Sequence, residues 1–251
     1  MSCRRLIARL DIKGDNVIKG LQLEGLRVIG KPSQLASKYY LDGADELLFV
    51  DTVASLYNRD NILKVVEDAA NTIFIPLTVV GGIRTLENAK QLLLSGADKV
   101  GLNTAAISRP SLLTEIADVF GSQCVVLSVE AKKFGSDWEL LTNNGRERTG
   151  MPIGPWLEAA RKNGVGEIIV TSVDNDGMKN GLDLSLMSFA RENTDLPLIG
   201  CGGVASENDL IKGFVDSQLD GIAIASALHF DLLSLPQIRE KIGTHGFEIR
   251  K

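Results

Sequence analysis

Apolar runs recur along the chain, and an amphipathic segment separates each run from the next. Eight of these runs are rich in Val, Ile and Leu, as is typical of strands buried on both faces. They cover residues 5–11, 46–51, 75–80, 98–103, 124–130, 167–174, 196–201 and 220–226. The intervening segments have helical periodicity and cover residues 32–43, 59–72, 85–96, 111–121, 155–164, 184–193, 206–217 and 236–246. Eight strands, each followed by a helix, predict an α/β fold of the (β/α)8 TIM-barrel type and favour it over an open doubly wound sheet.

The pattern also repeats within the chain. "ADELLFVD" resembles "VGEIIVTS", and "IPLTVVGGIRTLENAK" resembles "LPLIGCGGVASENDLI". Glu46 and Glu167 are 121 residues apart, and so are Gly82 and Gly203. We therefore expect a single domain, residues 1–251, built from two related half-barrels at about 1–120 and 121–251.

Two stretches interrupt the alternation of strands and helices. Residues 13–31 are expected to form a long loop after the first strand. Residues 133–150 read as a small hairpin that turns at Asn144 and Gly145, since an Asn-Gly pair favours a tight turn. Both stretches follow strands, so both should lie at the C-terminal face, where barrel enzymes have their active sites.

Composition narrows the class of protein. The 251 residues are 44% hydrophobic, and the net charge of −5 with no dense run of Lys or Arg argues against nucleic-acid binding. Three separated cysteines and two histidines offer no metal-ligand spacing, so we expect free thiols in a reducing compartment and neither a metal ion nor a cofactor. The apolar runs are too short to span a membrane, and a cytoplasmic protein is expected.

Glycine pairs follow the third and seventh strands at Gly81-Gly82 and Gly202-Gly203. Glycine at a strand end lets backbone N–H groups approach an anion, although a lone pair is also common in ordinary turns. The next strands end in "NTA" and "ASA", which are small and carry hydroxyl groups. Two such arrangements at equivalent positions predict two phosphate sites on opposite sides of one mouth, and hence a long substrate with a phosphate at each end.

Carboxylates end several of the predicted strands. Asp11 ends the first and Glu130 the fifth, which lie opposite each other in an eight-stranded barrel. Opposed acids over a cavity suit general acid–base catalysis, because different surroundings can separate their pKa values. Asp51 ends the second strand, and Asp176 lies in "SVDNDG", which could equally be a turn. Lys19 could neutralise substrate phosphate or remain a solvated loop lysine.

Charged residues also gather at the other end of the barrel. Arg5, Glu46, Lys99 and Glu167 lie at or near the starts of four strands. Two cations and two anions there could close the bottom as a ring of ion pairs. Such a ring could be a structural plug or a gate for a small molecule that moves along the barrel axis.

Seven segments resemble the cyclase subunit of imidazole glycerol phosphate synthase: "LDIKGDNVIKG", "GADELLFVD", "IPLTVVGGIR", "GADKVGLNTAA", "FGSQCVV", "GEIIVTSVDNDG" and "CGGVASENDL". The resemblance runs from about residue 3 to the end of the chain. It implies a glutamine amidotransferase partner at the N-terminal face and ammonia that moves through the barrel to the C-terminal face. There the ammonia would react with a bis-phosphate phosphoribulosyl aminoimidazole carboxamide ribotide, in histidine biosynthesis, yielding imidazole glycerol phosphate and a purine precursor.

The resemblance also implies roles for individual residues. Asp11 matches the first catalytic aspartate of the family, Glu130 takes the place of the second, and Lys19 and Asp176 match active-site positions. The matched phosphate-binding positions are Gly82, Asn103, Thr104, Gly177, Gly203, Ala225 and Ser226. The matched gate is complete and consists of Arg5, Glu46, Lys99 and Glu167.

The departures from the family pattern cluster near the expected active site. Val80 replaces the first glycine of a triplet, Gly101 and Cys201 replace serines, and Glu130 is one methylene longer than the usual aspartate. Displacing a catalytic acid by about an ångström can cost roughly 10²-fold in rate. Residues 51–61 also depart from the family sequence.

Three functions therefore remain open. The first is a cyclase that uses Asp11 and Glu130 as base and acid. The second is a paralogue that channels ammonia for sugar amidation in surface polysaccharide synthesis, with little or no cyclase activity. The third is a non-catalytic barrel that binds and stimulates a glutaminase.

Arg9 stands where the family usually has a small residue. Strand alternation points its side chain into the barrel together with that of Asp11. Burying an unpaired guanidinium would be too costly, so we expect an ion pair with an interior carboxylate, with Glu130 as the leading candidate.

Overall fold

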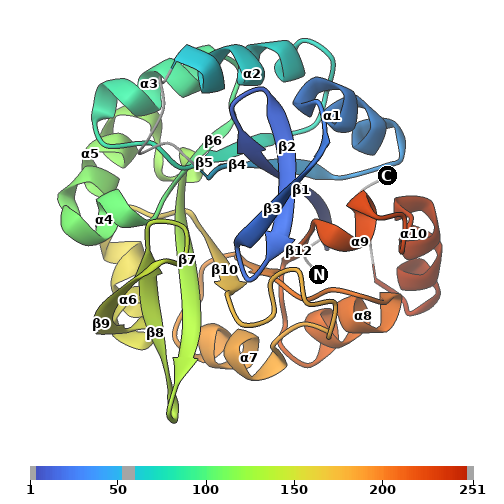
Figure 1. Cartoon of the computed structure of the whole chain (residues 1–251). Helices are drawn as coiled ribbons and strands as arrows, with labels where there is room; N and C mark the ends of the chain where they lie inside the picture. The colour runs from blue at the N-terminus through green and yellow to red at the C-terminus, as the bar shows by residue number, and fades with distance from the viewer. Residues whose placement is uncertain (1–3, 53–59, 248–251) are drawn as a thin grey trace.

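The structure is a computed structural model that describes residues 4–52 and 60–247. Eight parallel strands close into a barrel, and helices surround it (Figure 1). The barrel strands, in spatial order, are β1 (Arg5–Lys13), β4 (Glu46–Asp51), β5 (Leu77–Val80), β6 (Lys99–Leu102), β7 (Val125–Phe134), β10 (Glu167–Ser172), β11 (Leu198–Cys201) and β12 (Gly221–Ile224). Pairing of β12 with β1 closes the barrel, which confirms the predicted fold class.

The outer layer contains the predicted helices within a few residues of their expected bounds. They are α1 (Pro32–Leu41), α2 (Asp60–Ala70), α3 (Leu86–Leu94), α5 (Ser111–Phe120), α6 (Ile153–Ala160), α7 (Leu184–Glu192), α8 (Glu207–Val215) and α10 (Leu235–Thr244). Two short helices, α4 (Thr104–Ser108) and α9 (Ser226–His229), were not predicted. Both begin directly after a barrel strand, at "NTA" and "ASA". None of the described helices is long and apolar enough to cross a membrane.

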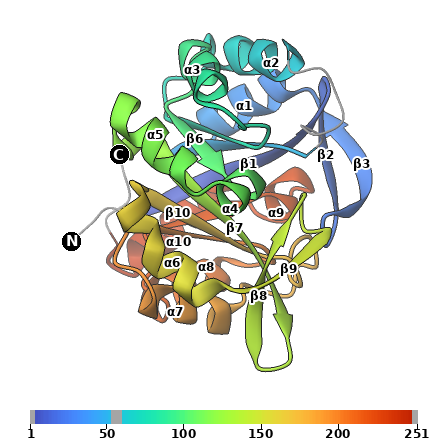
Figure 2. The same ribbon diagram turned by 90° about the vertical axis from the view of Figure 1, so that its left-hand side faces the viewer.

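The prediction of a loop at residues 13–31 was wrong. This segment forms β2 (Asn16–Leu21) and β3 (Glu24–Gly30), an antiparallel hairpin in which β2 pairs with the end of β1. The second irregular stretch turns at residues 143–146 as expected, between β8 (Asp137–Thr142) and β9 (Glu147–Pro152). β7 extends to Phe134 because it also pairs with β8. Both hairpins project from the same side of the barrel (Figure 2).

Two apolar layers stabilise the barrel. The larger one lies between the strands and the surrounding helices and includes Leu6, Leu10, Phe49 and Leu127. The smaller one fills the barrel itself. We call it the inner apolar cluster, and it consists of Ile7, Leu48, Val80, Val126, Ile169, Ile199, Cys201 and Ala223, with Val50 packed against it. The barrel interior is therefore a packed core, as is usual for this fold.

Candidate functional site

Four charged side chains form a closed ring at the C-terminal end of the barrel. Arg9 Nε lies 2.7 Å from Asp11 Oδ1, and Lys19 Nζ lies 2.9 Å from Asp11 Oδ2. Lys19 Nζ also lies 2.8 Å from Asp176 Oδ2, and Arg9 Nη1 lies 4.0 Å from Asp176 Oδ1. We call these four residues the upper ring. All four are buried, so Lys19 is not a solvated loop lysine.

The ring confirms the expected ion pair between Arg9 and an interior carboxylate, but the leading candidate for that carboxylate, Glu130, was wrong. The ion pairs of Arg9 are with Asp11 and Asp176, not with Glu130. Arg9 and Asp11 are two residues apart on one strand and point to the same side, so the Arg9 guanidinium lies within reach of the Asp11 carboxylate. The guanidinium also donates to Cys201 Sγ at 3.1 Å and to Thr171 Oγ1 at 3.5 Å.

The ring determines the protonation of Asp11. Burial alone would raise the pKa of this carboxyl, but the attraction of Arg9 and Lys19 outweighs burial and places the pKa well below its usual range. In turn, the pKa values of Arg9 and Lys19 are raised, because the attraction of Asp11 and Asp176 exceeds the effect of burial. Asp11 is therefore a fixed anion with both oxygens engaged, which is a poor arrangement for a proton acceptor.

Glu130 has the opposite environment. Burial raises the pKa of its carboxyl to about 7, although hydrogen bonds from the Gly145 N–H and the Asn103 side chain partly oppose this shift. Both donors contact Oε2, at 2.8 Å and 2.9 Å, and no described residue donates a hydrogen bond to Oε1. A carboxyl that titrates near neutrality can both donate and accept a proton. Asp11 and Glu130 thus differ in protonation. Such a difference is expected of two facing carboxyl groups that have separate roles.

Glu130 opens onto a cavity of about 440 Å³ in the first half of the barrel. The predicted residues Asp51, Gly82, Asn103 and Thr104 line the same cavity. Asn103 contacts Glu130 through its amide nitrogen, while its Oδ1 is buried without a partner among the described residues. Sequence reasoning treated Asn103 only as a phosphate ligand and missed that it holds Glu130.

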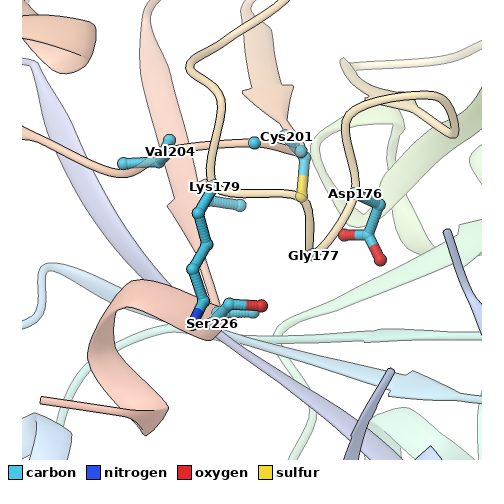
Figure 3. A pocket seen from close by; sticks show the side chains of 10 residues that line it. Asp176, Gly177, Lys179, Cys201, Val204 and Ser226 are labelled. Carbon is cyan, nitrogen blue, oxygen red and sulfur yellow. The ribbon is translucent and has the colours of Figure 1, made fainter. Parts of the chain in front are cut away.

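A second, narrow pocket of about 10 Å³ lies in the other half of the barrel (Figure 3). Asp176, Gly177, Gly203, Ala225 and Ser226, all predicted site residues, line it. Lys179 also lines this pocket and was not predicted. Its side chain extends toward Ser226, and its Nζ lies 4.7 Å from the centre of the Phe230 ring. Lys179 follows the predicted phosphate-binding residue Gly177 by two positions, and this spacing was the sequence feature that could have predicted its place in the pocket.

The backbones of the two half-sites match closely. Gly81 and Gly202 have φ values of 104° and 103°, so both adopt a conformation that favours glycine. Asn103 and Ala225, at the starts of α4 and α9, have φ/ψ values of −122°/−89° and −120°/−82°. The internal repeat itself stays a prediction, and these matched angles support it.

The two pockets are separated by the β2–β3 hairpin. The Gln22 N–H donates to the Asp176 carbonyl oxygen at 2.7 Å, and Leu23 packs with Leu141 and Val173 on the far side of the mouth. The hairpin therefore crosses the mouth and carries Lys19 into the upper ring.

The predicted ring also forms at the opposite end of the barrel. Arg5 lies 3.0 Å from Glu46 and 2.5 Å from Glu167, and Lys99 lies 3.1 Å and 2.8 Å from the same two carboxylates. Burial opposes charge on Arg5, but Glu167 and Glu46 more than compensate and raise its pKa. We call these four residues the lower ring.

Comparison with known proteins places the chain in a family. A family model described as "Histidine biosynthesis protein" matches residues 5–234. The chain is 53% identical over 205 residues to the imidazole glycerol phosphate synthase subunit HisF of Legionella pneumophila, covering 81% of this chain and 97% of that protein. It is 40% identical to the protein of that name from Myxococcus xanthus and 38% identical to that from Natranaerobius thermophilus, each over 250 residues, with at least 99% of each chain covered.

These relatives give no support to the alternative of a surface-polysaccharide paralogue, since all three carry the name of the histidine-pathway subunit. The family match spans both half-sites, the upper ring and the lower ring. The chain belongs to the histidine biosynthesis protein family and, within it, to the HisF subunits.

Proposed function

We propose that this chain is the cyclase subunit of an imidazole glycerol phosphate synthase. The observation that carries the proposal is the pair of pockets at matching backbone positions, one on each side of the mouth. Such a mouth suits an elongated substrate with a phosphate at each end, as the phosphoribulosyl aminoimidazole carboxamide ribotide has. The names of the relatives, which are synthase subunits, agree with this activity.

Glu130 is the proton-transfer group in this proposal. It lines the larger cavity, has one oxygen free of described donors and has a pKa of about 7. Asp11 acts as a fixed negative charge that stabilises a developing cation on the substrate, rather than as the base. This division differs from the expected one, because Arg9 and Lys19 hold Asp11 in its ionised form.

Backbone N–H groups and nearby cations would bind the two phosphates. Gly82, Asn103 and Thr104 serve one phosphate, and Gly177, Gly203, Ala225 and Ser226 serve the other. The second pocket is narrow and Lys179 lies along it, so phosphate entry requires this side chain to move. A substrate that spans both pockets also displaces the β2–β3 hairpin and Lys19 with it.

The lower ring would be the entry gate for ammonia. A glutaminase subunit docked at the N-terminal face would release ammonia next to Arg5, Glu46, Lys99 and Glu167. The word "subunit" in the names of the relatives agrees with such a complex.

The test is turnover of the purified full chain with the ribotide and ammonium chloride at alkaline pH. We expect imidazole glycerol phosphate to form, and Glu130→Gln to lower the rate by about 10²- to 10⁴-fold, the range for loss of a general acid or base. Glu147→Gln, an exposed carboxylate on β9, is the matched control and should leave the rate unchanged.

The pH profile separates the two roles of Glu130. With free ammonia held constant, a general acid gives a rate that falls as pH rises through about 7, and a general base gives one that rises. A correctly folded chain that shows no turnover with ammonium would contradict the cyclase proposal.

A further inference from the structure

The inner apolar cluster lies between two rings of similar composition. The lower ring has Arg5, Lys99 and two glutamates, and the upper ring has Arg9, Lys19 and two aspartates. The two rings differ in burial. The side chains of Arg5 and Lys99 are 18% and 17% exposed, whereas those of Arg9 and Lys19 are 4% and 2% exposed. The upper ring is therefore the more tightly closed of the two.

Arg9 closes the upper end of the inner apolar cluster. It belongs to β1, but its guanidinium reaches Cys201 on β11 and Thr171 on β10, two and three strands away around the barrel. Cys201 is itself a member of the cluster. The side chain thus extends across the interior, directly above apolar residues, instead of following the wall next to its own strand.

We propose that the upper ring is a second closure of the barrel axis, with Arg9 as the side chain that blocks passage. The inference rests on the proposed function in one respect, that ammonia is the molecule that crosses. Ammonia that has passed the lower ring enters the inner apolar cluster and reaches the mouth only when Arg9 leaves its position over Cys201.

Two members of the upper ring belong to segments that lie at the mouth of the barrel. Lys19 comes from the β2–β3 hairpin, and Asp176 comes from the segment after β10 that lines the second pocket. An anion in the second pocket repels Asp176 and attracts Arg9, which weakens the contacts that hold Arg9 across the axis. Passage is therefore coupled to occupancy of the second pocket.

The rate at which the Cys201 thiol is chemically modified can report whether the upper ring is closed. Its side chain is 1% exposed, and its Sγ lies 3.1 Å from Arg9 Nη1. With Cys3 and Cys124 replaced by serine, methyl methanethiosulfonate can modify only Cys201. The thiolate attacks the thiosulfonate sulfur, forms a mixed disulfide and releases methanesulfinate, so the rate can be followed by mass spectrometry.

The predicted effect of Arg9→Met is faster labelling of Cys201. Loss of the closure exposes Cys201 and should accelerate labelling by about tenfold or more. Arg9→Lys keeps the charge but has a single nitrogen, so it cannot pair with Asp11 and reach Cys201 together. Arg9→Lys should give a labelling rate between those of the parent and Arg9→Met. It replaces Arg9→Met as the test variant if Arg9→Met does not fold.

Arg5→Met is the matched control, because it opens the lower ring and leaves the upper ring intact. Its labelling rate should equal that of the parent. An unchanged or slower rate in both Arg9 variants overturns the proposal, as does equal acceleration in Arg5→Met, which would reflect general loosening. Turnover with ammonium tests the proposed function separately, so a barrel without cyclase activity could still show the closure, and an active cyclase could lack it.

Discussion

Val80 and Gly101 occupy neighbouring positions on the inner faces of β5 and β6. A Cβ added to Gly101 would lie 2.4 Å from Val80 Cγ2, closer than real atoms approach. The family pattern has the reverse distribution of bulk, glycine at the first position and serine at the second. The two departures therefore compensate each other, and together they keep the interior filled without overlap.

Compensation predicts a non-additive pair of substitutions. Gly101→Ser alone overpacks the interior and should destabilise the fold by about 1 to 3 kcal/mol. In Val80→Ala/Gly101→Ser the colliding methyl is gone, so the cost should fall below the sum of the single variants by about 0.5 to 3 kcal/mol. Urea unfolding measures both quantities. Gly243→Ser, where an added Cβ meets nothing within 4 Å, is the control. Additive values would show that the two positions are independent.

Glu130 makes stability depend on pH. Its pKa rises from 4.5 in the unfolded reference to about 7 in the folded protein, so the folded state binds the proton more tightly. That stabilisation is complete below pH about 4.5 and is lost as pH rises through about 7. Glu130→Gln should therefore stabilise the protein above pH 7, by at most about 3 kcal/mol, and have little effect at pH 4. Thermal unfolding across this range is the measurement. A variant that is less stable than the parent at pH 8 would contradict it.

The β2–β3 hairpin shows how a single close contact positions an element. A Cβ added to Gly177 would lie 2.3 Å from the Gly20 carbonyl oxygen, so the two backbones touch. Gly177 also has a φ of 75°. Only glycine allows the segment after β10 to approach the hairpin this closely, and the approach brings Lys19 to Asp176.

Gly177→Ala should lift the hairpin from the mouth. We expect faster tryptic cleavage after Arg27, an exposed residue of β3, together with weaker binding of inorganic phosphate. Gly135→Ala separates the two possible causes, because Gly135 has a similar φ of 65° but an added Cβ there meets nothing within 4 Å. Equal cleavage rates in the two variants would attribute the effect to backbone strain and not to the contact.

At the scale of the whole molecule, the two charged rings lie at opposite ends of the inner apolar cluster. The lower ring joins β1, β4, β6 and β10, and so it links both halves of the barrel. Removing one cation leaves two buried carboxylates with a single partner, which is less favourable than keeping or removing the whole ring.

Lys99→Met tests this end of the barrel. It should destabilise the fold by about 1 to 3 kcal/mol, because Glu46 and Glu167 then share only Arg5. In the proposed complex with a glutaminase, product formed per glutamine hydrolysed should fall, while turnover with added ammonium should stay near that of the parent. Lys90→Met, which removes an exposed cation on α3, is the control. An equal loss in both assays would place the defect in the cyclase site instead of the gate.

The pattern of apolar runs was sufficient to predict the barrel, since strands buried on both faces and alternating with amphipathic helices have few other arrangements. It also predicted the lower ring, because strand alternation decides which side chains point inward. The hairpin formed by residues 16–30 was not predicted. Its strands pair outside the barrel, and the local sequence pattern of such strands does not differ from that of a polar loop.

What the sequence determined by itself was the fold and the set of charged residues that face its interior. Which of those charges meet was decided only by the tertiary structure. Arg9 pairs with Asp11, Asp176 and Cys201 because the hairpin and the segment after β10 close over it, and Glu130 stays apart beside Asn103 and Gly145. Protonation follows from those contacts, since a buried carboxyl next to two cations remains ionised and one without them titrates near neutrality.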